Sequence, residues 1–164
     1  MAKFNQLLSH VLTWIATVLL GCFVLTILLG VFYRYVLNAP LVWSEELARN
    51  LNIWSVFLGA TVALYEIDHL RVDILDRSVE RWPHALRALL SLLLIAAEAL
   101  FAWSLVLGGW HMTLDRWDVP LTTLPFNQGW IYLAAPLSAV IMLWFLAWQA
   151  WGTARSFAHR GGKR

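Results

Sequence analysis

Long stretches without a charged side chain dominate this sequence. No Asp, Glu, Lys or Arg occurs from Phe4 to Tyr33. At 1.5 Å per residue, a helix of this length exceeds the roughly 30 Å thickness of a bilayer's hydrocarbon core. The pattern predicts a first transmembrane helix at about residues 11–33. Because the apolar stretch is far longer than that of a signal peptide and no small-residue cleavage site follows it, we expect it to be retained as an anchor.

Three further transmembrane helices follow from the same pattern. They are predicted at about residues 44–66, 83–109 and 129–151. Ser44 is the expected N-cap of the second, because a hydroxyl there can accept a hydrogen bond from an unpaired backbone amide. Pro83 suits the first position of the third helix. Pro136 is expected to kink the fourth. The sequence therefore predicts an all-α integral membrane protein, folded as a single domain over residues 1–164.

The distribution of Lys and Arg predicts the orientation of the four helices. These residues resist translocation when they lie in short connections. Nine of them fall in the two tails and in or near the connection between the second and third spans, and three fall in or near the other two connections. We therefore expect both termini in the cytoplasm. In the middle connection, residues 67–82, apolar positions recur every three or four residues, which predicts an amphipathic helix lying in the membrane interface.

Composition excludes several classes of function. Hydrophobic residues make up 60% of the chain and charged residues 13%, about half the charged share of a soluble domain. The net charge is +2 with no basic arm, so nucleic acid is not an expected partner. The five histidines lie at span ends or in loops, the single cysteine is Cys22, and no hydrolase, phosphate-binding or metalloprotease motif occurs. We expect no metal, no cofactor and no enzymatic activity.

Glu98 is the one carboxylate placed well inside a predicted span. A charge at that depth is costly, so such a residue is a candidate for function. It could serve as a proton or cation relay, as an anchor to another helix, or as a structural residue hydrogen-bonded within its own bundle. The relay is the least favoured of the three, because one isolated carboxylate makes a poor pathway.

A denser group of charges surrounds the start of the second span, namely Arg34, Glu45, Glu46 and Arg49. Glu45 and Arg49 are one helical turn apart, and Arg34 ends the first span on the same side of the membrane. A salt-bridge network joining the two spans is the favoured interpretation, and a docking surface for a second protein is the alternative.

Other features of the chain favour a partner subunit. Gly59 and Ala60 form a flat patch that another helix can approach closely. Four spans with so few polar groups cannot by themselves enclose an aqueous route. His69 and Asp73 are spaced like a base and its orienting carboxylate, but a polar face towards headgroups or a partner loop is the better interpretation.

The region from residue 32 to residue 76 resembles the small permease subunit of tripartite ATP-independent periplasmic (TRAP) transporters, the DctQ-type family. The resemblance rests on Arg34, Tyr35, Asn38, Pro40, Trp43, Glu45, Glu46, Leu47, Trp54, Phe57, Leu58, Gly59, Ala60, His69, Leu70, Arg71, Val72 and Asp73. The four-span layout extends the similarity over the whole chain.

The resemblance implies a non-enzymatic scaffold in the bacterial inner membrane. Its implied partners are a large permease subunit and a periplasmic substrate-binding protein, which together import an organic acid such as a C4-dicarboxylate, a 2-oxo acid or sialic acid with sodium. The loop with Asp115, Arg116 and Asp118 is a candidate contact for the binding protein. Two alternatives remain open at this point, a self-sufficient proton-coupled exporter using Glu98 and a membrane haem or electron-transfer protein.

Overall fold

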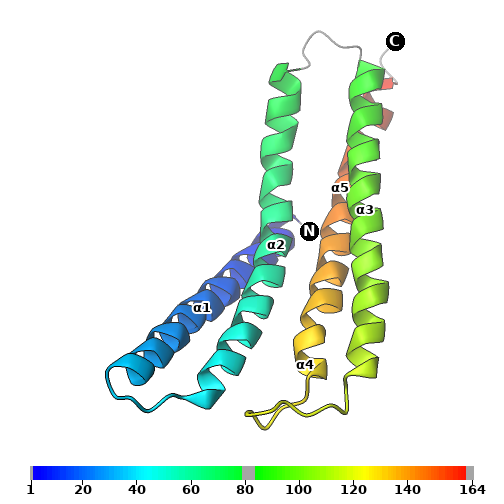
Figure 1. Cartoon of the computed structure of the whole chain (residues 1–164). Helices are drawn as coiled ribbons and strands as arrows, with labels where there is room; N and C mark the ends of the chain where they lie inside the picture. Colours follow the sequence, from blue (N-terminus) through cyan, green and yellow to red (C-terminus); the bar gives the residue numbers. More distant parts are fainter. Residues whose placement is uncertain (1, 79–83, 162–164) are drawn as a thin grey trace.

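The apolar stretches fold into four long helices and one short one in the computed structural model (Figure 1). The structure describes the backbone at residues 2–78 and 84–161, and side chains at residues 3–66, 90 and 92–151.

The helices follow one another in an up-and-down order. They are α1 (Ala2–Tyr35), α2 (Val42–Ser78), α3 (His84–Asp115), α4 (Gly129–Tyr132) and α5 (Ala134–Gly161). Four of their segments are long and apolar enough to cross a membrane, namely Lys3–Tyr35, Val42–Glu66, Leu92–Asp115 and Gly129–Trp151. The predicted all-α fold with four spans is confirmed.

Several helix boundaries in the structure differ from the predicted ones. α2 begins at Val42, so Ser44 lies in its first turn instead of capping it, and the Ser44 hydroxyl donates to the Leu41 carbonyl at 2.7 Å. α3 continues six residues beyond 109, to Asp115. The kink predicted at Pro136 is observed as an interruption of the helix at Leu133, between α4 and α5. Its cause is Pro136, which has no N–H to donate to the carbonyl of residue 132 and whose ring crowds that carbonyl.

The described part of the middle connection, residues 67–78, is helical, and residues 79–82 lie outside the described residues. Residues 67–78 continue α2 without a break instead of forming a separate element. A position in the membrane interface stays a prediction, as does the side of the membrane on which the termini lie.

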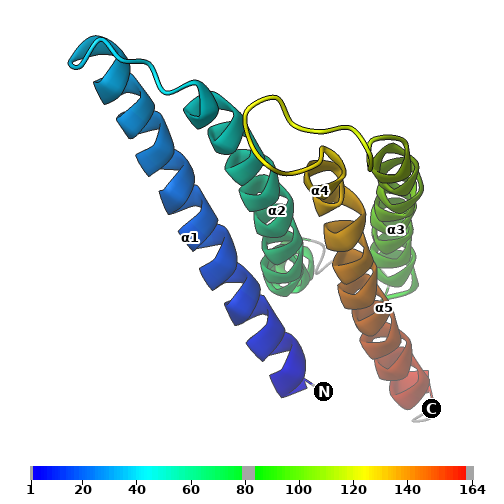
Figure 2. The same ribbon diagram turned by 90° about the horizontal axis from the view of Figure 1, so that it is seen from below.

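The four long helices stand in a row, in the order α1, α2, α5, α3 (Figures 1 and 2). The two helices at the ends of the row bury little of their surface: the most apolar 18-residue windows of α1 and α3 are 6% and 11% buried, against 28% and 39% for α2 and α5. A row exposes two broad faces, so most of the apolar surface of this chain must be covered by lipid or by another protein.

Small and aromatic side chains hold the row together. Leu12, Leu58, Val62 and Phe145 form a buried cluster that joins α1, α2 and α5. Elsewhere between α2 and α5, the Thr61 hydroxyl lies 3.0 Å from the carbonyl of its own turn at residue 57 and 3.4 Å from the Ser138 carbonyl. Close backbone approach through small residues is the usual way in which helices associate in lipid, where water exclusion contributes nothing.

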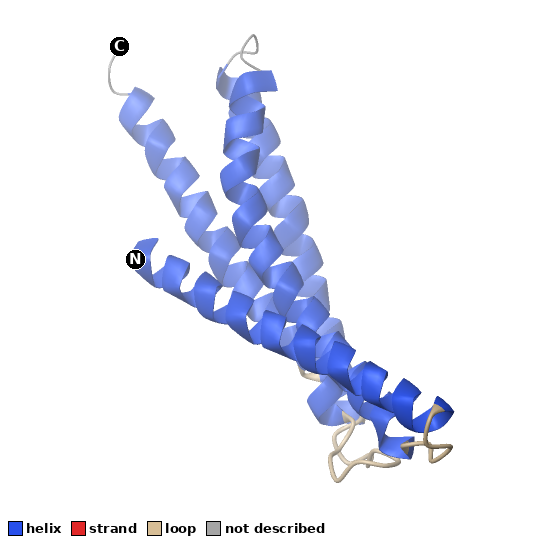
Figure 3. Ribbon diagram, turned by 90° about the vertical axis from the view of Figure 1, so that its left-hand side faces the viewer, coloured by secondary structure: helices blue, strands red, loops and turns tan. Residues whose placement is uncertain are grey.

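Two irregular segments connect helices at the same end of the row (Figure 3). Residues 36–41 join α1 to α2, and residues 116–128 join α3 to α4. We call this the loop end. The start of α1 and the end of α5 both lie away from it (Figure 3). Several of the functional candidates described below lie at the loop end, including Arg34, Glu45, Glu46 and Arg49.

Candidate functional site

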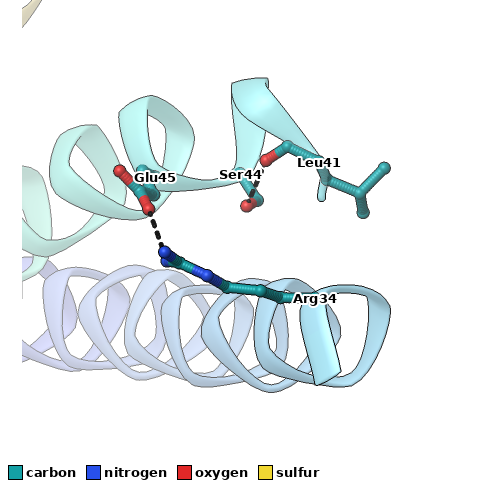
Figure 4. A network of polar contacts seen from close by, with 4 residues as sticks. All are labelled: Arg34, Leu41, Ser44 and Glu45. Atoms are coloured by element: carbon teal, nitrogen blue, oxygen red, sulfur yellow. Dashed lines mark hydrogen bonds and ion pairs between the residues drawn. The ribbon is translucent and has the colours of Figure 1, made fainter. Parts of the chain in front are cut away.

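The contact between α1 and α2 at the loop end is an ion pair supported by a close helix approach (Figure 4). Arg34 Nη1 lies 3.6 Å from Glu45 Oε1, and both side chains are largely exposed. One turn before Arg34, a Cβ on Gly30 would lie 2.9 Å from Ser44 Oγ, so a larger residue would require the Ser44 side chain to shift. An exposed pair of this kind contributes little to stability. The pair therefore affects the relative orientation of α1 and α2 more than the stability of their contact.

The predicted charge network divides between two faces of α2. Glu45 faces α1, whereas Arg49 lines a groove on the side of α3. Among the side chains that the structure describes, Arg49 takes part in no ion pair, so the predicted pairing of Glu45 with Arg49 is replaced by the pairing of Glu45 with Arg34. Competition from the neighbouring helix is the reason, because Arg34 reaches the carboxylate from across the α1–α2 contact.

Glu46 connects α2 to the loop between α3 and α4. Its Oε1 accepts a hydrogen bond from the Thr122 amide at 3.1 Å, and its Oε2 accepts one from the Thr123 amide at 2.7 Å. The Thr123 hydroxyl also donates to Oε2. Hydrogen bonds to an ionised acceptor are stronger than those between neutral groups. One carboxylate therefore fixes the position of a loop that is 76 residues away in sequence.

The loop itself has an internal fold that presents the two threonines to Glu46. A β-bridge pairs Pro120 with Asn127. The Leu121 amide donates to the Phe126 carbonyl at 2.9 Å, and the amide of residue 128 donates to the Val119 carbonyl at 2.8 Å. The resulting hairpin places residues 122–125 at its tip, beside the start of α2.

Aromatic side chains fix the base of this loop. The rings of Trp117 and Trp130 lie 5.9 Å apart at 35°. A Cβ on the buried Gly129 would lie 2.8 Å from Cε3 of the Trp117 ring. Tryptophans with exposed edges are typical of the level where membrane meets water. Trp43, at the start of α2, is also partly exposed at this end.

The charged loop residues that the sequence singled out do not form a cluster with Glu46. Asp115, Arg116 and Asp118 are all exposed, and no ion pair joins them within the described part of the chain. They are available to a partner at the loop end.

The remaining candidates lie away from the loop end. Glu98 is half-buried near the middle of α3. Ala60 is exposed, and a Cβ on Gly59 would meet no atom within 4 Å, so this patch is not filled by a helix of this chain. The side chains of His69, Arg71 and Asp73 lie outside the described residues.

Sequence reasoning missed two kinds of contact. Nothing in the sequence around Thr122 and Thr123 indicates that these residues hydrogen-bond to Glu46. Asn5 of α1 accepts a hydrogen bond from the Trp144 indole of α5 at 3.3 Å, and Asn5 is almost fully buried. An asparagine within an uncharged stretch could have indicated such an interhelical bond. Among the described residues, no group of three or more His, Cys, Asp or Glu is placed to hold a metal ion.

The comparisons with known proteins agree on one family. The model of the family described as "Tripartite ATP-independent periplasmic transporters, DctQ component" matches residues 23–156. A TRAP transporter small permease protein of Haemophilus influenzae is 26% identical over 145 residues, which cover 87% of this chain and 86% of that protein.

Two further relatives have names that include a solute. The sialic acid TRAP transporter small permease protein SiaQ of Vibrio cholerae is 26% identical over 110 residues, 67% of this chain and 62% of that protein. The sialic acid TRAP transporter permease protein SiaT of Haemophilus influenzae is 29% identical over 112 residues, 67% of this chain but only 17% of that protein. A segment similar to this chain is thus a minor part of a much longer permease.

Proposed function

The chain belongs to the DctQ component family of the tripartite ATP-independent periplasmic transporters, and from that membership we propose that it is the scaffold subunit of a sodium-coupled importer of an organic acid. The family is a transporter component and not an enzyme. As a member with four apolar spans, the chain is a multi-pass protein of the inner membrane.

The observation that carries the scaffold role is how the hydroxyl groups within the spans are bonded. Those of Thr13, Thr26, Thr61 and Thr113 each donate to a carbonyl four residues earlier on their own helix. A hydroxyl that donates to the backbone of its own helix has no hydrogen to offer an acidic solute. This favours a packing role over a conducting one.

The expected membrane partner is a larger permease subunit. The similarity to a minor part of the SiaT permease supports this, because there a related segment shares one polypeptide with a much longer permease sequence. The exposure of α1 and α3 at the two ends of the row supports it as well, since either helix offers a continuous apolar face to a neighbour.

The loop end is proposed to face the periplasm and to contact a substrate-binding protein. The count of Lys and Arg, nine against three, supports that orientation. Asp115, Arg116 and Asp118 are exposed there, beside a hairpin that Glu46 holds in place. Exposed charges of both signs steer a partner into register more than they tighten its binding.

Recognition of the solute is assigned to the other chains. The small permease relative SiaQ carries a name that includes sialic acid. Organic acids are accordingly the class to test, with sodium as the coupling ion.

The test is reconstitution into vesicles with each subunit omitted in turn. The chain would be combined with the large permease subunit and the binding protein from the same genome, and uptake of labelled sialic acid, C4-dicarboxylates and 2-oxo acids would be measured with and without an inward sodium gradient. Uptake should require all three proteins and the gradient. Flux through vesicles that hold only this chain, or undiminished uptake without it, would overturn the proposal.

A further inference from the structure

A groove lies between α2 and α3 at the loop end and is lined also by residues of α4 and the start of α5. These two elements stand between α2 and α3 (Figure 1). Its volume is about 610 Å³, within the range of about 300–1,000 Å³ that is usual for sites holding a small molecule. The hairpin of residues 119–128 borders it at the loop end through Leu121 and Thr122. The two helices that form its sides belong to different halves of the row, so an occupant would bridge them.

Polar and apolar lining residues separate along the groove. Glu46, Arg49 and Asn50 of α2 lie towards the loop end, while Ile53 and Phe57 lie deeper. The α3 side offers Leu105, Gly108 and Met112, which are apolar or have no side chain, and Ser104, whose hydroxyl donates to the Phe101 carbonyl of its own helix at 2.7 Å. The groove therefore combines a polar entrance with a mainly apolar interior, which suits an amphipathic ligand.

The length of the groove matches one leaflet of a bilayer. Glu46 and Phe57 are eleven residues apart on α2, which corresponds to about 16 Å of helix. Half of a hydrocarbon core that is about 30 Å thick is about 15 Å. A helix of a partner protein would be expected to follow α2 and α3 through both leaflets, whereas the lining residues stop near the middle of the membrane.

Arg49 supplies the charge that selects the ligand. It lies seven residues inside α2, is exposed, and forms no ion pair with any side chain that the structure describes. A long cationic side chain near a helix end extends to the headgroup level, where an anion can pair with it. Phosphate groups of lipids are the anions available at the boundary between headgroups and hydrocarbon, and Arg binds phosphate through paired N–H donors.

We propose that the groove between α2 and α3 holds one phospholipid of the leaflet at the loop end, with its phosphate on Arg49 and one acyl chain along Phe57, Leu105 and Gly108. The lipid lies against α4 and the start of α5, between α2 and α3. It acts as a structural ligand and takes no part in solute recognition.

A pair of glycine substitutions tests the apolar part of this site. A Cβ on Gly108 would meet no atom within 4 Å, so the leucine of Gly108→Leu would extend into the groove. Gly21 on α1 has equally open surroundings and does not line the groove, which makes Gly21→Leu the matched control. The chain would be purified in detergent together with its large permease partner, and bound phospholipid would be counted by native mass spectrometry. About one lipid per chain is expected for the unchanged protein and for Gly21→Leu, with at least a fivefold loss for Gly108→Leu.

The charged part of the site is tested separately. Arg49→Gln should lower lipid retention at least threefold, and Arg49→Lys should restore part of it, because the charge returns without the paired donors. Equal retention by the unchanged protein, Gly108→Leu and Arg49→Gln would overturn the proposal. Arg49→Gln introduces no larger side chain, so lipid retention can be measured in this variant even where Gly108→Leu fails to fold.

Photo-crosslinking distinguishes a lipid from a partner helix as the occupant. The complex would be placed in vesicles of phosphatidylethanolamine and phosphatidylglycerol that contain phosphatidylethanolamine with a diazirine in its acyl chain. Crosslinks are expected within residues 53–57 and 104–112, and they should be at least fivefold weaker in Gly108→Leu than in Gly21→Leu. Crosslinks that appear with this chain alone but vanish in the complex would show that the permease subunit occupies the groove, and the proposal would be wrong.

Discussion

Glu46, near the start of α2, accepts two hydrogen bonds from Thr123, one from its backbone amide at 2.7 Å and one from its hydroxyl. The two residues are 77 positions apart in sequence. With the bond from the Thr122 amide to Oε1, the carboxylate accepts three hydrogen bonds from a single loop. These bonds attach the hairpin to the start of α2.

Removal of this carboxylate should release the hairpin while leaving the bundle intact. In Glu46→Ala, the amides of Thr122 and Thr123 lose their acceptor, so their hydrogen exchange should accelerate by about tenfold or more. Hydrogen–deuterium exchange with mass spectrometry on the protein in nanodiscs measures this. Glu45→Ala is the matched control, because Glu45 pairs with Arg34 and makes no contact with the hairpin. Equal exchange in the two variants would show that Glu46 does not hold the loop.

Charge reversal at the same position should weaken transport without changing its specificity. Glu46→Lys places a cation where three donors converge, so the hairpin is displaced from its position at the loop end. Uptake should fall severalfold for every solute that the complex carries, because the proposed function assigns recognition of the solute to the other chains. Initial rates for a panel of competing acids check this. A changed order of preference in an intact complex would contradict the scaffold role.

The neighbouring glycines Gly108 and Gly109 should differ sharply in their tolerance of a methyl group. A Cβ on Gly109 would lie 2.7 Å from Cδ of Pro136 and 3.1 Å from its backbone nitrogen, whereas a Cβ on Gly108 meets nothing within 4 Å. The proline ring is fixed to the backbone and cannot move aside. Gly109→Ala should therefore destabilise the protein by about 1–3 kcal/mol, as overpacking does elsewhere. Unfolding in mixed micelles, with Gly108→Ala as the control, measures the difference. A similar loss in both variants would mean that α3 and α5 are not in close contact there.

The four spans were predictable because the bilayer itself sets their length. A backbone in lipid must bond internally, so an uncharged run of sufficient length can only become a helix. Boundaries were less predictable. Ser44 suits an N-cap, but α2 begins two residues earlier because the chain that leaves α1 turns at Asn38, whose φ is 51°, and reaches the helical conformation by Val42. Asparagine tolerates this left-handed conformation better than other non-glycine residues.

The contacts between distant segments could not be read from the sequence. The span count predicted that Arg34 and Glu45 lie on the same side of the membrane and belong to one group of charges, but it did not predict that Arg34 pairs with Glu45. The partner of Glu46 depends on how residues 116–128 fold, which no periodicity describes. The same holds for the groove beside Arg49, because its walls come from α2, α3, α4 and α5, whose packing against one another no periodicity describes.

The hydrogen bond between Trp144 and Asn5 should couple α1 to α5. Trp144→Phe keeps an aromatic ring but removes the indole donor, which leaves the buried Asn5 oxygen without this bond. The expected loss is roughly 0.5–1 kcal/mol, the usual value for a polar contact between membrane helices. A double-mutant cycle with Asn5→Leu measures the coupling, and Trp103→Phe on the exposed face of α3 is the control. A coupling energy of zero would show that the two side chains do not interact in the membrane.

The effect of substituting Glu98 on uptake distinguishes a scaffold subunit from a proton-coupled exporter. An exporter that works alone needs a carboxylate that gains and loses a proton within the membrane, and Glu98 is the only acidic residue well inside a span. Glu98→Gln keeps the size of the side chain and its capacity to hydrogen-bond but cannot release a proton. If the chain is a scaffold, the reconstituted complex should keep the proposed sodium-driven uptake within about twofold of the unchanged protein. The reason is that a conservative substitution away from a functional site changes the free energy of unfolding only slightly.

Glu98→Asp serves as the control for packing, since it keeps the carboxylate but shortens the side chain. Abolished uptake in Glu98→Gln with near-normal uptake in Glu98→Asp would show that the proton itself is required, and the chain would then take part in transport directly.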